Sequence, residues 1–292
     1  MDLHSAGHRR GVVAAPHVAA ADDGRDVLAD GGNAIEAMIA MAATIAVAYP
    51  HMNHLGGDAF WLFRDPHGRV RAIEAAGPAG EAARRELYRD YEAIPPRGPL
   101  AALTVPGAIG GWSLACEAAR AFGGKIPLDA LLGPAIRRAR EGYGVTAGQA
   151  RLTTEKLAEL RDVPGFAATF LVDGKPPSPG AVLGQRALAD TVDHLAHAGL
   201  DDFYRGDVGR EVAADLEMIG SPITRGDLAR YRANLREPLE LALPAGTLYN
   251  TPPPTLGLAS LIILGLFERL RVREAETFEH VHAVVEIGRA HV

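Results

Sequence analysis

A short loop that carries a histidine, two glycines and an aspartate is the segment of this chain best suited to chemistry. It runs His54-Leu55-Gly56-Gly57-Asp58 and leads into the aromatic run 60–63. Paired glycines let backbone N–H groups approach a ligand closely. The same residues also suit a tight turn that begins a strand, and the residues alone leave both interpretations open. The G-x-G-x-x-G spacing of a dinucleotide site is missing.

The other reactive side chains form no diagnostic pattern. His280 and His282, with His291 nearby in sequence, have no carboxylate or cysteine at a spacing typical of a metal site, so we predict no metal and no cofactor. The single cysteine, Cys116, lies in a stretch of small and apolar residues and is interpreted as a core residue rather than a nucleophile. A G-x-S-x-G motif is absent, which argues against a serine hydrolase.

Composition limits the class of protein. The 292 residues are 48% hydrophobic and 23% charged, enough to build a sizeable core. The net charge is −6 and no basic cluster occurs, so nucleic acid is not an expected partner. Arginine greatly outnumbers lysine and alanine and glycine are abundant, which is typical of a GC-rich bacterial genome. One cysteine excludes an internal disulfide framework.

Membrane and export signals are weak. The longest apolar run, 37–50, is too short to span a bilayer, so no membrane association is expected. Near the N-terminus, Gly11–Ala15 could mimic a secretion signal, but Pro16 interrupts the apolar stretch at once. We interpret 11–15 as a short buried strand and expect a cytoplasmic protein, with the periplasm as the alternative.

Several elements are expected to position the loop. A helix near 20–30 should end at Gly31-Gly32, and Asn33 with Glu36 forms a capping box for the next helix. The aromatic run 60–63, the turn at 65–68 and the run 70–75 predict a hairpin. Further expected elements are a helix over 128–139 that Gly142 stops, a helix over 188–197, a turn into 201–204 with 201–202 exposed to solvent, a proline corner at 251–257 in which Thr255 caps a helix, and a buried helix over 258–267. This mixture favours a layered α+β or αββα architecture.

Six stretches together resemble the gamma-glutamyltranspeptidase family, a branch of the N-terminal-nucleophile hydrolases. In chain order they are 31–37, 49–60, 105–111, 127–142, 203–231 and 252–257. The resemblance implies a helix-rich part of an αββα sandwich. It also implies that residues 1–286 are the large-subunit portion of a proenzyme and are incomplete without the small subunit.

The resemblance implies a mechanism as well. A family proenzyme (a zymogen) cleaves itself before a threonine, which becomes the N-terminal nucleophile of the small subunit and forms an acyl-enzyme with an amide. Water then completes hydrolysis, and an amine completes transfer. That threonine is expected beyond the end of this chain, so no catalytic residue is predicted within it. We expect the chain alone to be inactive and to aggregate, because apolar faces and strand edges stay open.

One departure from the family pattern bears on the substrate. Members that act on gamma-glutamyl compounds carry an Arg-Glu-x-Ala-Pro motif whose arginine holds the substrate carboxylate, and here Glu74 occupies that arginine's place. A carboxylate would repel that anion. Arg69 or Arg71 could supply the charge if the alignment slips. The substitution, with Trp61 and the segment 94–99, looks more like the oxamate amidohydrolase branch, which hydrolyses a small amide beside a carboxylate.

The predicted substrate-binding set is therefore His54, Gly56, Gly57, Asp58 and Glu74. The predicted function of the full-length protein is hydrolysis of a small amide such as oxamate. A true gamma-glutamyl transferase or hydrolase, and a non-catalytic binding protein, are the alternatives.

The last six residues, 287–292, form a separate case. They read Ile-Gly-Arg-Ala-His-Val, which equals the translation of the common sequencing-adapter codons ATC GGA AGA GCA CAC GTC. Our hypothesis is that 287–292 are a non-native tail from adapter read-through.

Overall fold

The computed structural model describes residues 11–272 and 274–289. The α-helices are α1 (Val18–Ala29), α2 (Ala34–Ala48), α3 (Ala108–Ala121), α4 (Leu128–Glu141), α5 (Ala147–Leu160), α6 (Phe166–Phe170), α7 (Arg186–Ala198), α8 (Asp202–Arg205), α9 (Asp207–Met218), α10 (Arg225–Arg230), α11 (Gly257–Leu270) and α12 (Phe278–Arg289). The strands are β1 (Ala59–Arg64), β2 (Val70–Ala75), β3 (Tyr143–Gly144), β4 (Val182–Leu183), β5 (Asn234–Arg236), β6 (Leu239–Leu243) and β7 (Gly246–Asn250). Two short 3-10 helices, Arg85–Tyr88 and Pro99–Ala101, interrupt the segment between β2 and α3.

A three-stranded antiparallel sheet, in the order β1-β2-β5, forms one layer of the molecule. The predicted hairpin is confirmed, with Trp61 paired to Ile73 across β1 and β2. The third strand comes from far along the chain, and it places Asn234 opposite Glu74 at the end of β2. Only part of the sheet is covered, because Phe60 and Leu62 on β1 remain 41% and 43% exposed.

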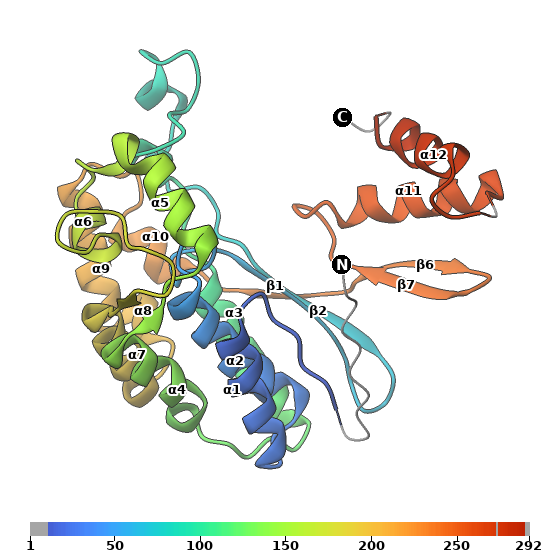
Figure 1. The fold of residues 1–292 in the computed structure, drawn as a ribbon, viewed down its shortest axis with the longest axis horizontal. Coiled ribbons are helices and arrows are strands. Elements are labelled where there is room, and N and C mark those ends of the chain that lie inside the picture. The colour runs from blue at the N-terminus through green and yellow to red at the C-terminus, as the bar shows by residue number, and fades with distance from the viewer. Residues whose placement is uncertain (1–10, 273, 290–292) are drawn as a thin grey trace.

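Helices cover the other face of this sheet (Figure 1). α3 packs on β1 and β2, α2 packs on α3, and α1, α4 and α7 continue the stack. The capping box that starts α2 is present as predicted: the Asn33 side chain accepts from the Glu36 amide, and the Glu36 carboxylate accepts from the Asn33 amide. Cys116 lies in the core, as expected, and burial raises its pKa to about 11.

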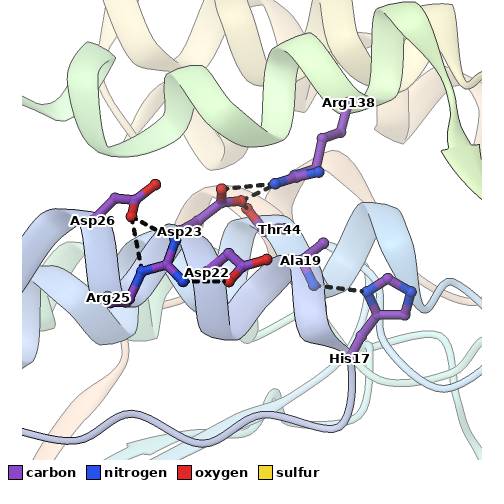
Figure 2. A network of polar contacts seen from close by, with 8 residues as sticks. All are labelled: His17, Ala19, Asp22, Asp23, Arg25, Asp26, Thr44 and Arg138. Carbon is purple, nitrogen blue, oxygen red and sulfur yellow. Dashed lines mark hydrogen bonds and ion pairs between the residues drawn. The ribbon is translucent and has the colours of Figure 1, made fainter.

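One buried carboxylate links three of these helices (Figure 2). Asp23 of α1 accepts two hydrogen bonds from Arg138 of α4, at 2.9 and 3.1 Å, and one from the Thr44 hydroxyl of α2, at 2.6 Å. At the start of α1, the Nδ1 of His17 accepts from the Ala19 amide. Burial and then the nearby Arg138 charge lower the pKa of His17, which favours the neutral ring that this cap requires.

Removing the cation of this network should destabilise the helix stack. In Arg138→Met, Asp23 keeps only Thr44, and we expect a loss of about 2–3 kcal/mol, because the carboxylate stays buried while water reaches part of the vacated site. Urea denaturation followed by circular dichroism measures it. The control is Arg25→Gln, which removes exposed pairs with Asp22 and Asp26 and should change stability little. Equal losses in the two variants would contradict this account.

The C-terminal part of the chain extends away from the helix stack (Figure 1). The hairpin β6–β7 packs against α11, and α12 packs on α11. The prediction that the helix over 258–267 is buried was wrong: Leu258 is 46% exposed and Leu264 is 43% exposed. In the described structure, only Gly257 and Leu261 of α11 are buried, because this helix has a partner on one side and none on the other.

Three other local predictions need correction. The segment 11–15 is not a buried strand: it has no regular structure, and Val12 is 71% exposed. The expected turn is present at 200–201, but it ends before Asp202, which begins the short helix α8. Thr255 accepts from the Gly257 amide, as a cap would, but the N-cap residue of α11 is Leu256.

Other predictions are met. The first helix ends before Gly31-Gly32, α4 ends at Gly142, and α7 spans the expected 188–197. The α+β class is confirmed. Along the described residues, no helix combines the length and apolar content that crossing a membrane requires. Of the predicted tail, 287–289 end α12, whereas 290–292 lie outside the described residues, so that hypothesis stays a prediction.

Candidate functional site

An open cleft of about 600 Å³ lies where the sheet ends. One wall is the segment that leaves β2, and the other is the segment from α10 into β5. The lining residues are Glu74, Ala76, Gly77, Pro78, Ala79, Glu81, Asp227, Arg230, Tyr231, Arg232, Asn234 and Pro254. These walls are joined directly, because the Glu81 amide donates to Asp227 at 3.2 Å.

The predicted glycine loop, His54–Asp58, holds the start of α3 and one wall of the cleft in place. The Gly57 carbonyl accepts from the amides of Gly107 and Ala108 at the start of α3, at 2.9 and 2.8 Å. The Asp58 carboxylate accepts from the Gly77 amide at 3.3 Å. The loop therefore holds the segment after β2 in place through its backbone and one side chain.

The five predicted substrate-binding residues do not all meet at the cleft. Glu74 lines it, and Asp58 contacts the lining residue Gly77. The Gly57 carbonyl accepts hydrogen bonds from the start of α3. His54 and Gly56 are exposed and are not among the lining residues. Substrate binding by these five residues stays a prediction.

Glu74 is held in an ion pair. Its two carboxylate oxygens accept from Nε and Nη2 of Arg236, at 3.1 and 3.2 Å. The Glu74 side chain is only 15% exposed, while Arg236 is half exposed. Because the pair is nearly neutral, Glu74 presents much less negative charge than an unpaired carboxylate would.

The alternative cations considered for this position lie elsewhere. Arg71 pairs with Asp65 at 3.3 Å, and Arg69 pairs with Glu237 at 2.8 Å. Neither arginine lines the cleft. The alternative in which one of them supplies the positive charge therefore has no geometric support.

The opposite wall is built around Asp227. Burial alone would raise its pKa, but hydrogen bonds from the Thr224 side chain and backbone, then from the Glu81 amide, hold that pKa below its usual value. Arg230 donates to Asp227 at 2.7 Å and pairs with Glu81 at 3.1 Å. Asp227 is therefore held ionised and paired with Arg230.

Two tyrosines belong to this region, Tyr231 in the lining of the cleft and Tyr204 outside it, and the sequence prediction did not include them in the site. The Tyr204 hydroxyl donates to the Pro106 carbonyl and accepts from the Gly110 amide, both at 2.9 Å. Burial raises the pKa of Tyr231 strongly, and the negative charges of Asp58 and then Glu74 raise it further. Both tyrosines therefore stay protonated. They stand in the family-like stretch 203–231, which was the only sequence signal for them.

The described residues, 11–272 and 274–289, contain no group of three His, Cys, Asp or Glu side chains that could hold a metal ion. His280 accepts from the Glu276 amide, and His282 stacks on Phe278. His291 lies outside the described residues.

Comparisons with known proteins give a consistent result. Residues 20–291 match the family described as Gamma-glutamyltranspeptidase. The chain is 48% identical over 277 residues to the oxamate amidohydrolase proenzyme of Klebsiella pneumoniae, covering 94% of this chain and 52% of that protein. It is 34% identical over 278 residues to a glutathione hydrolase-like proenzyme of Bacillus subtilis, with the same coverages of 94% and 52%. The chain thus spans about half the length of these curated relatives.

Solved structures show the same likeness. The Helicobacter pylori gamma-glutamyltranspeptidase superposes with a TM-score of 0.90 at 26% identity, covering 98% of this chain and 83% of that one. The Pseudomonas nitroreducens gamma-glutamyltranspeptidase, complexed with L-DON, gives 0.85 at 31% identity, with coverages of 96% and 84%. This likeness confirms the predicted fold, an open part of the αββα architecture.

Proposed function

The chain belongs to the gamma-glutamyltranspeptidase family, whose large-subunit portion it covers, and we propose that the complete protein hydrolyses a small amide such as oxamate. The observation that carries this proposal is the 48% identity, over 94% of the chain, to an oxamate amidohydrolase proenzyme. The glutamate at position 74, paired with Arg236 in the cleft wall, supports it. Because Glu74 occupies Arg236, neither side chain offers a free cation to a gamma-glutamyl carboxylate.

The proposed nucleophile is a threonine at the start of a small subunit, released when the proenzyme cleaves itself. We place this threonine outside residues 1–292 and propose that the chain alone is inactive. Support comes from relatives named as proenzymes, of which the chain covers about half. In the proposed reaction, the threonine hydroxyl attacks the amide carbonyl, its own α-amino group takes the proton, and ammonia leaves before water releases the acid.

The open surfaces of this chain support a small subunit as its partner. Apolar side chains on α11 and α12 are exposed, including Leu258, Leu264 and Val285. The strand β1 is an edge of its sheet and carries exposed Phe60. Such surfaces are typical of an interface rather than of a protein that folds alone.

The test is to sequence the source locus past codon 286, express the uninterrupted gene and follow two reactions. We expect one polypeptide to split into two, and the product to release ammonia from oxamate faster than it cleaves gamma-glutamyl-p-nitroanilide. Faster cleavage of the anilide would favour the transferase alternative. A genuine stop after Val292, with no cleavage and no hydrolysis, would favour a binding protein instead.

A further inference from the structure

Three arginines occur in the short segment that runs from α10 into β5. Arg230 and Arg232 line the cleft, and Arg236 pairs with the lining residue Glu74. A substrate with a carboxylate beside its amide needs a cation that no protein carboxylate already occupies. The three arginines differ in this respect.

Two of these arginines are already neutralised. Arg230 is shared between Asp227 and Glu81, at 2.7 and 3.1 Å. Arg236 holds both oxygens of Glu74. A substrate anion could use either one only by displacing a protein carboxylate, which would then lie unpaired beside that anion.

Arg232 is different. Its Nη1 donates to the main-chain carbonyls of Tyr231 at 2.7 Å and Ala229 at 3.1 Å. Among the described residues, no carboxylate pairs with it, and its Nε and Nη2 groups have no protein acceptor. The carbonyls fix one edge of the planar guanidinium and leave its other donors for a ligand. The side chain of Asn234, two residues on, lines the same end of the cleft.

We propose that Arg232 binds the carboxylate of the substrate and so selects amides that carry an adjacent anion. This inference rests on the proposed hydrolase function and assigns the specificity of that site. Arg232 takes the anion in bidentate geometry, which fixes the orientation of the neighbouring amide. Its role is binding and orientation, and it takes no part in the bond-making steps.

The test compares two substrates that differ only in charge. Oxamate carries the carboxylate, and oxamide carries a neutral carboxamide in the same place. In the complete, processed protein, Arg232→Gln should raise the KM for oxamate about 10- to 100-fold, the range expected for losing a charged hydrogen bond. The KM for oxamide should change less than about threefold. Arg232→Lys should bind oxamate more tightly than Arg232→Gln does, because lysine keeps the positive charge but lacks the two parallel N–H donors of the guanidinium. Arg186→Gln, an exposed change on α7, is the control.

Binding of oxamate, measured by calorimetry, separates this inference from the proposed function. Binding that Arg232→Gln abolishes, in a protein that hydrolyses neither amide, would support Arg232 while refuting the hydrolase. Hydrolysis with equal KM changes for both substrates, or with none, would overturn the role of Arg232 and leave the hydrolase standing. An oxamate-selective defect in Arg236→Gln but not in Arg232→Gln would also overturn it, by moving the anion site to Arg236. Failure of the wild-type protein to bind oxamate would overturn both.

Discussion

Gly77→Ala should abolish soluble expression of the complete protein or lower its stability by about 3 kcal/mol or more. A Cβ atom at this position would lie 1.6 Å from the Val105 carbonyl oxygen and 2.5 Å from its carbon. Val105 cannot move aside easily, because it is buried and its amide donates to the Pro78 carbonyl at 3.0 Å. The clash is with backbone on both sides, so no change of side-chain rotamer relieves it. Soluble yield and thermal unfolding measure the effect.

The matched control is Gly144→Ala on β3. A Cβ there meets no atom within 4 Å, and the residue is exposed. We expect a change of no more than about 0.5 kcal/mol, as for most surface substitutions. If Gly77→Ala folds as well as Gly144→Ala does, the backbone of Gly77 does not lie as close to that of Val105 as the structure places it.

Local elements of the fold could be predicted from the sequence where the residues that determine them lie close together in the chain. The capping box of Asn33 and Glu36 lies within four residues, and the hairpin of β1 and β2 follows from two apolar runs on either side of one turn. Family-like stretches carried the overall architecture, because their order along the chain is specific even though each one is weak. These are the features that the structure confirms.

The candidate site was harder to predict because its walls are remote in sequence. Glu74 meets Arg236 across 162 residues, and the Glu81 amide meets Asp227 across 146. The sequence pattern of one wall contains no information about which residues form the other. The sequence analysis therefore identified Glu74 but not Arg236, the arginine that pairs with it. The glycine loop has residue types that suit ligand contact, and that role stays a prediction; in this structure its Gly57 carbonyl contacts the start of α3 and its Asp58 side chain contacts Gly77.

The apolar helix α11 illustrates a different limit. A run that is apolar on nearly every side predicts burial, but it does not say which chain supplies the cover. Here Leu258, Ile262 and Leu266 remain exposed in the chain by itself. This exposed apolar face fits the small subunit that we propose as the partner of the chain.

Charge placement at position 74 should decide which carboxylate substrates the complete protein accepts. The double variant Glu74→Arg with Arg236→Gln places a cation at position 74, where the family resemblance puts the arginine of gamma-glutamyl enzymes, and leaves no charge at position 236 to pair with it or repel it. We expect kcat/KM for gamma-glutamyl-p-nitroanilide to rise about 10- to 100-fold, because the unpaired guanidinium can form a charged hydrogen bond with the substrate carboxylate.

Two single variants separate the causes of that rise. Glu74→Gln removes the negative charge without adding a cation, so it should give a smaller gain than the double variant. Glu74→Arg alone sets two guanidinium groups against each other where Glu74 and Arg236 now pair at 3.1 Å, so it should lose more stability than the double variant does. A double variant that folds and keeps its oxamate activity, yet gains nothing on the anilide, would show that position 74 does not face the substrate. The preference for a small amide would then have to come from the opposite wall, from Arg232 and Asn234, and not from the acidic residue that first suggested it.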